Sequence, residues 1–283
     1  MMTALWMGDA ILQETVVRIG DVLGDELKNL TVERAVVGIF FSGVKLSNGM
    51  GGICFTPIKA IPEAVCCPSS ARAMPHSGKL AGESAETYIN RLTNGGPLQR
   101  ALSIAVLNAL SATCWQKQPP RDYQLKLGAD PVDETIIPSD AVVAVVGALV
   151  PYIKMLKQRG NPLFILEMDP RTLKEEEMRY YCASEQADAC LAEVDLIIIT
   201  GTTLLTNTLE GILARLKKGA RAILVGPTAS MLPDSFFERG IEAIGGIMVT
   251  NADLLLDTLA EAGSGYHFYG KSAERITIHR NLS

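Results

Sequence analysis

The chain has 283 residues, a hydrophobic share of 48%, a charged share of 20% and a net charge of −5. These values describe an ordinary globular protein that needs no disulfide or metal for stability, and the chain lacks the basic stripe of a nucleic-acid-binding protein. No apolar run approaches the roughly 18 residues that span a membrane, and residues 1–10 lack the features of a signal peptide. We therefore expect a cytoplasmic protein with no nucleic-acid or membrane partner.

The first part of the chain, residues 1–118, predicts an α+β domain. Apolar positions spaced by three and four residues predict a helix over 5–23. An antiparallel meander of three strands follows, with turns at Ser42-Gly43 and Ser47-Asn48-Gly49. The predicted strands cover 32–41, 44–46 and 52–57. An irregular loop is expected from 62 to 82.

Two helices are predicted to close this domain. Ser84 is the expected N-cap of a helix over 84–92, and Pro97 opens the next helix. Apolar and mostly small residues follow Pro97 with regular helical spacing as far as Leu110, which indicates close packing in the core. Asn108 lies among them, and the pattern alone favours a satisfied buried amide over a group aimed at a cleft.

Residues 119–137 are predicted to be a linker, because they combine several prolines with many charges and little periodicity. The second domain, residues 138–283, carries four short apolar runs, each of which stops at a small polar turn. These runs are 142–146, 163–166, 196–199 and 222–225. With helical stretches between them, they predict a doubly wound parallel sheet covered on both faces. Two further strands are expected near 244–249 and 275–279.

The turns after the four runs form one candidate site, because ligands of doubly wound sheets bind at the carboxyl ends of the strands. The candidate ligand-binding residues are Gly147, Asp169, Thr200, Gly201, Thr202, Thr203, Gly226, Pro227 and Thr228. Threonine hydroxyls and backbone N–H groups at helix starts suit a phosphate or carboxylate, although a threonine N-cap with nothing bound fits equally well. Glu167 could contact a ligand hydroxyl, or could cap the helix expected near Pro170.

Several site classes find no support in the sequence. Only one glycine of the GxGxxG dinucleotide fingerprint is present, at Gly147, and there is no GxSxG nucleophile motif. No CxxC or HExxH spacing indicates a metal site. The six cysteines are expected to be reduced thiols, with Cys182 and Cys190 as packing residues about two turns apart on one helical segment. No cofactor or metal is assigned.

The order of motifs resembles the DUF364/DUF4213 family, called putative heavy-metal chelation proteins. The resemblance rests on these segments: 52–57, 101–110 with its Asn108-Ala109 pair, Glu167-x-x-Pro170, 199–207, and 225–228 followed by Pro233, Phe237, Gly240 and Gly246. It implies an enolase-N-terminal-like α+β domain, a Rossmann-like domain and a cleft between them. It also implies a condensation or hydrolysis step on a pterin-, flavin- or siderophore-like compound linked to heavy metals.

We therefore expect a protein that binds a small anionic metabolite or metal chelate in the inter-domain cleft. If it is an enzyme, Glu167 is the candidate acid/base group, and Asn108 reaches in from the first domain. The alternatives are a non-catalytic metal or metallophore carrier and a methyltransferase-like enzyme that uses S-adenosylmethionine. A homodimer is expected only because symmetric dimers are the commonest assembly.

Overall fold

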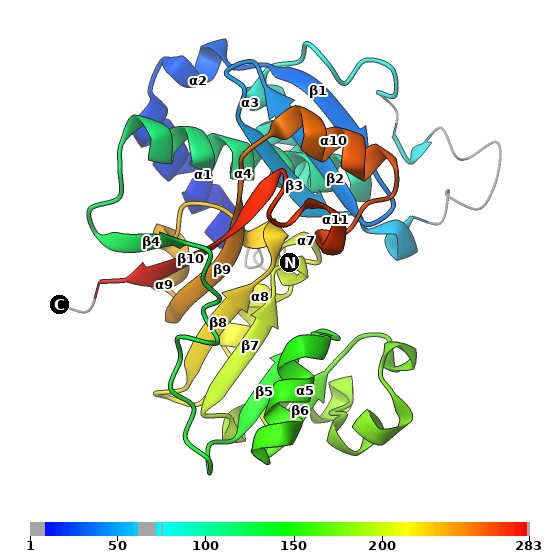
Figure 1. The fold of residues 1–283 in the computed structure, drawn as a ribbon, viewed down its shortest axis with the longest axis vertical. Helices are drawn as coiled ribbons and strands as arrows, with labels where there is room; N and C mark the ends of the chain where they lie inside the picture. The colour runs from blue at the N-terminus through cyan, green and yellow to red at the C-terminus, as the bar shows by residue number, and fades with distance from the viewer. Residues whose placement is uncertain (1–8, 62–71, 75, 282–283) are drawn as a thin grey trace, which may run out of the picture.

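The computed structural model describes residues 9–61, 72–74 and 76–281. The start of the predicted first helix, most of the predicted 62–82 loop and Cys66 and Cys67 lie outside them. The described chain forms a three-stranded and a seven-stranded sheet with helices around both (Figure 1). Among the residues that the structure describes, none of the helices combines the length and the hydrophobicity needed to span a lipid bilayer.

The elements of the first part follow the predicted order. They are α1 (Ala10–Leu23), α2 (Glu26–Asn29), β1 (Val32–Val37), β2 (Phe41–Leu46), β3 (Gly51–Phe55), α3 (Ala85–Asn94) and α4 (Pro97–Lys117). Ser84 caps α3, since its hydroxyl accepts a hydrogen bond from the Thr87 N–H at 3.2 Å. The predicted turn at Ser42-Gly43 is wrong. Both residues lie within β2, and the chain reverses earlier, where the Gly38 N–H donates to the Phe41 carbonyl.

The three-stranded sheet lies between two helices that are far apart in the sequence. Helix α4 covers one face, and α10 (Ala252–Ala260) packs on the other (Figure 1). Two glycines permit these close approaches. A Cβ on Gly52 would lie 2.1 Å from the Ala105 carbonyl oxygen of α4, and a Cβ on Gly43 would lie 2.8 Å from Cδ2 of Leu256 in α10.

The seven-stranded sheet contains all four predicted runs as parallel strands. Its strands are β4 (Tyr123–Leu127), β5 (Val143–Val146), β6 (Leu163–Leu166), β7 (Leu196–Thr200), β8 (Arg221–Val225), β9 (Ile241–Val249) and β10 (Ala273–Arg280). They lie in the order β4-β10-β9-β8-β7-β5-β6, parallel from β6 to β9. Strand β10 is antiparallel to both of its neighbours. The chain is therefore α/β, with an α+β first part and a mostly parallel second sheet.

Two elements pack outside the domain in which the sequence prediction placed them. Strand β4 comes from the segment predicted as a linker, yet it pairs with β10 along the edge of the large sheet. Helix α10 follows the parallel strands of the large sheet in the chain, yet it packs on the small sheet. The proposed bounds of 1–118, 119–137 and 138–283 stay a prediction.

Helices cover both faces of the large sheet. The remaining helices are α5 (Val150–Arg159), α6 (Ala187–Glu193), α7 (Thr202–Leu205), α8 (Leu209–Leu213), α9 (Asp234–Phe237) and α11 (Gly265–Phe268). Helix α5 packs on one face, where Ile153 and Leu156 meet Val143 and Val145. The opposite face belongs to a core that runs without a break into α1, α3 and α4. The first part of the chain thus shares its core with the large sheet.

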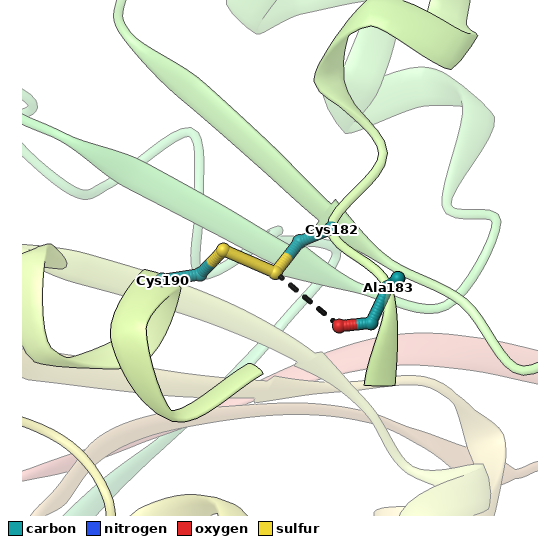
Figure 2. Close-up of a disulfide and its surroundings, with 3 residues drawn as sticks. All are labelled: Cys182, Ala183 and Cys190. Atoms are coloured by element: carbon teal, nitrogen blue, oxygen red, sulfur yellow. Dashed lines mark hydrogen bonds between the residues drawn. A yellow bond between two sulfur atoms is a disulfide. The ribbon is translucent and has the colours of Figure 1, made fainter. Parts of the chain in front are cut away.

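Cys182 and Cys190 form a disulfide (Figure 2), so the prediction that these two are reduced packing residues on one helix is wrong. The Cys182 N–H donates to the carbonyl of Ile165 in β6. A short 3-10 turn follows, and α6 begins only at Ala187. This break in the helix brings the two sulfurs together. The other cysteines among the described residues, Cys54 and Cys114, are buried free thiols.

Replacing both cysteines of the disulfide, as Cys182→Ser with Cys190→Ser, should lower the free energy of unfolding by about 2–3 kcal/mol. The physical reason is that the bridge restricts the unfolded chain over a short loop. Urea denaturation measures the loss, and a reductant should produce the same loss in the wild-type protein. Alkylation of both residues in denatured, unreduced protein would contradict the bridge.

Candidate functional site

The predicted turns meet at the carboxyl ends of the parallel strands. The chain leaves β5 for β6 on one side and then adds β7 on the other side of β5, so β5 and β7 flank a topological switch point. Ligands of open α/β sheets bind at such points. The first part of the chain lies above these strand ends, toward which the arrowheads of β7 and β8 point (Figure 1). We call residues 147–149, 167–169, 200–203 and 226–228 the carboxyl-end turns.

Gly147 and Thr200 lie side by side across the switch point. Gly147 has a φ of +95°, which disfavours other residues, and a Cβ at this position would lie 2.9 Å from Cγ2 of Thr200. Gly226 has a φ of +117°, and a Cβ there would lie 3.9 Å from the Gly201 nitrogen. Three of the carboxyl-end turns therefore form one continuous surface of bare backbone and threonine side chains.

The threonine turn after β7 divides into an accessible pair and a buried residue. Thr200 and Thr202 are half-buried, and the Thr202 hydroxyl lies 3.2 Å from the Thr200 hydroxyl oxygen. Thr203 is buried, and its hydroxyl donates to the Thr200 carbonyl at 2.7 Å. Thr203 thus fixes the turn, while Thr200 and Thr202 can offer hydroxyls to a ligand.

The side chains of Asn108 and Thr228 lie in the contact between the two parts of the chain. Nδ2 of Asn108 lies 2.7 Å from the Ile53 carbonyl oxygen and 3.1 Å from that of Thr228. It also lies 3.3 Å from the Pro227 carbonyl oxygen. The Thr228 hydroxyl accepts from the Phe55 N–H at 3.0 Å. Both side chains are buried, so they join the parts and do not line an open surface.

One atom of this contact remains unsatisfied. Oδ1 of Asn108 is buried and has no hydrogen-bond partner within the described ranges, although the amide nitrogen has three carbonyl neighbours. The three carbonyls fix the orientation of the amide, since only its NH2 group can donate to them. Asn108 is therefore buried, as predicted, but only its amide nitrogen is hydrogen-bonded and its oxygen is not.

The two acidic residues after β6 are engaged within the protein. Oε1 of Glu167 accepts from the Asp169 N–H at 3.0 Å, as in a capped turn. The Asp169 carboxylate accepts from Nε of Arg171 at 2.7 Å and from Nζ of Lys59 at 2.9 Å. These hydrogen bonds hold the pKa of Asp169 well below its usual range, so the carboxylate stays ionised. Lys59 and Arg171 are thus both paired with Asp169 beside the carboxyl-end turns.

Arg100 is a residue that the sequence reading did not single out. Its Nε and Nη2 donate to the carbonyls of Leu205 and Leu204, the last residues of α7. Its two terminal nitrogens pair with the Asp9 carboxylate, and Nη1 also donates to the Leu92 carbonyl. All donors of the guanidinium fork are oriented by these partners. Arg100 therefore fixes the helix that begins at Thr202, and no spacing in the sequence indicates this contact.

The described residues provide no ready site for a bare metal ion. No group of three or more His, Cys, Asp or Glu side chains within them could hold one. Burial raises the pKa of Cys54 to about 12 and that of Cys114 to about 12, so both thiols stay protonated at neutral pH. Soft metals bind thiolates, and the two cysteines of the disulfide are not available as such.

Two of the hollows formed by the described residues lie at opposite ends of the parallel strands. The larger, of about 1270 Å³, lies at the amino ends and is lined by residues such as Arg221, Glu242 and His279. The smaller, of about 190 Å³, lies at the carboxyl ends and contains Leu149 and Gly226 of the carboxyl-end turns. The fold rule for doubly wound sheets favours the smaller one as part of the candidate site.

Two family models match the chain, DUF364 over residues 130–278 and DUF4213 over residues 20–111. Both are described as "Putative heavy-metal chelation". An uncharacterised protein of Methanocaldococcus jannaschii is 31% identical over 196 residues, which are 66% of this chain and 69% of that protein.

Two solved structures share the fold at 19% sequence identity. One is a DUF364 protein of unknown function from Pyrococcus horikoshii, with a TM-score of 0.73 over 95% of this chain and 99% of its own. The other comes from Desulfitobacterium hafniense, with a TM-score of 0.68 over 95% and 98%. At this identity, the two likenesses establish the fold alone.

Asn108→Ala should lower the free energy of unfolding by about 3 kcal/mol, because it removes the donors of three backbone carbonyls between the two parts. Urea denaturation followed by the fluorescence of buried Trp115 measures the change. Asn29→Ala, at an exposed position in α2, is the matched control and should change stability by less than about 0.5 kcal/mol. Equal effects of the two substitutions would contradict the role given to Asn108.

Proposed function

Because the chain belongs to the DUF364/DUF4213 family, we propose that it binds a small anionic metabolite, or a heavy metal carried as an organic chelate, at the carboxyl-end turns. The observation that carries the proposal is the contact among Gly147, Thr200 and the Gly201–Gly226 pair at the switch point. Bare backbone allows a ligand to approach closely, and the Thr200 hydroxyl, which accepts from the Thr202 hydroxyl, can donate to its oxygens.

A chelate fits the described residues better than a bare ion does. An ion needs several protein ligands arranged around it, and the described ranges contain no such cluster. A chelate brings its own ligand atoms and presents carboxylate or hydroxyl oxygens to the protein. The family description is thus met by recognition of the organic part, with the metal as cargo.

Binding without turnover is the form of the proposal that the side chains favour. Asn108 is committed to three backbone carbonyls, and Glu167 accepts a hydrogen bond within its own turn. The Asn108 amide is therefore not available to a substrate, whereas Glu167 keeps acceptor sites on its second oxygen. The engagement of Asn108 supports the carrier over the condensation or hydrolysis enzyme that the family resemblance implies.

Protein purified without added metal tests the proposal by native mass spectrometry and elemental analysis. We expect a bound organic species and, where metal is present, no more than one metal ion per organic molecule. Metal bound with no organic component would contradict the chelate. Turnover of the bound species into a new mass would contradict the carrier.

Thr202→Val should weaken binding of nickel citrate at least tenfold in isothermal titration calorimetry, because it removes one hydroxyl from the accessible pair. Thr206→Val is the matched control, since that exposed hydroxyl bonds to the backbone of its own segment and to Thr208. Ni²⁺ ions alone should bind wild-type protein more weakly than nickel citrate. Unchanged nickel citrate binding by the Thr202 variant, or tighter binding of the bare ion, would overturn the proposal.

A further inference from the structure

The hollow of about 190 Å³ beside the carboxyl-end turns contains side chains that the proposed function does not use. We call it the Arg275 pocket. The lining residues that bear on its chemistry are Asp130, Tyr152 of α5, Gly226 after β8, Gly245 of β9, Tyr269 and Arg275 of β10. A water molecule occupies about 30 Å³ in the liquid, so the pocket has the volume of about six waters.

Arg275 supplies positive charge and unused donors. Its guanidinium carbon lies 4.9 Å from the centre of the Tyr269 ring, a distance at which cation–π attraction orients the group. Nη1 lies 3.8 Å from Oδ2 of Asp130, too far for a hydrogen bond. Within the described ranges, the side chain makes no hydrogen bond. The planar fork is therefore oriented and free to bind a carboxylate through two N–H groups.

Asp130 supplies the opposite charge at a fixed position. Its Oδ1 accepts from the Val132 N–H at 3.0 Å, and its Oδ2 accepts from the Tyr152 hydroxyl at 2.8 Å. Burial and the neighbouring Asp130 charge raise the pKa of Tyr152, so the phenol remains a donor. Each carboxylate oxygen has two acceptor sites, so Asp130 can accept a further hydrogen bond from a ligand.

A cation and an anion held close together complement a ligand that carries both charges. A phosphate dianion would meet the repulsion of Asp130 near Arg275, whereas a zwitterion places its ammonium by the acid and its carboxylate by the fork. The backbone of Gly226 leaves one wall of the pocket without a side chain, whereas the Pro131 ring packs against Gly245. An α-amino acid of about six non-hydrogen atoms has a size that matches the volume.

We propose that the Arg275 pocket binds the amino-acid head group of a zwitterionic ligand, with Arg275 on the carboxylate and Asp130 on the ammonium. The ligand is a free α-amino acid or a larger compound that ends in one. This site shares Gly226 with the carboxyl-end turns but does not use the threonine hydroxyls, and it does not depend on the proposed chelate binding.

Isothermal titration with each of the twenty proteinogenic α-amino acids tests the inference on the full chain. At least one should bind with a Kd below about 1 mM, a value that a very small ligand can reach. Its N-acetyl derivative and its α-hydroxy analogue should bind at least tenfold more weakly, because each lacks the ammonium group. Failure of all twenty to bind, or equal binding of the hydroxy analogue, would overturn the inference.

Two substitutions at the pocket separate it from the carboxyl-end turns. Arg275→Lys keeps the charge and loses the fork, and Asp130→Asn keeps the acceptor for Tyr152 and loses the charge. Each substitution should weaken binding of the amino acid at least tenfold and leave the circular dichroism spectrum of the protein unchanged. Thr202→Val should leave amino-acid binding within twofold. If Arg275→Lys had no effect, the inference would fail while nickel citrate binding could still hold.

Discussion

Helix α4 is buried along nearly its whole length, so its polar side chains must find partners inside the protein. Arg100 and Asn108 are two of these side chains, and both reach backbone carbonyls of the second part of the chain. Arg100 holds the end of α7, and Asn108 holds the turn after β8. The geometry of the carboxyl-end turns therefore depends on a helix from the other part of the chain. A change in the position of α4 would displace the turns after β7 and β8 together.

Much of the fold could be predicted from the sequence, because the relevant patterns are local. Short apolar runs identified β5 to β8, and helical spacing with small residues identified α4. The turn at Ser42-Gly43 was wrong because the glycine serves the approach of α10 and not a reversal of the chain. Strand β4 was missed although Tyr123, Leu125 and Leu127 alternate with polar residues, because this five-residue run lies among prolines and charges. The disulfide was missed because a break between Cys182 and Cys190 is invisible in the residue spacing.

The sequence predicted where the candidate site lies. It did not predict which of its polar side chains are already hydrogen-bonded within the protein. A parallel sheet brings the ends of its strands to one edge, so the meeting of Gly147, Thr200 and Gly226 follows from the runs before them. Whether a polar side chain is free depends on partners distant in the sequence. The Thr228 hydroxyl accepts a hydrogen bond from Phe55, and the Asp169 carboxylate accepts one from Lys59. Each donor lies more than a hundred residues away in the sequence. Arg275 and Asp130 come close because β10 pairs antiparallel with β4, the strand that ends just before Asp130.

The seating of α10 on the small sheet also affects how the protein is made. Residues 32–55 form that sheet, but the helix that covers its second face is translated about two hundred residues later. Until then the apolar face around Val36 and Phe41 has no cover from its final partner. Contacts between such distant segments slow folding and leave intermediates prone to association.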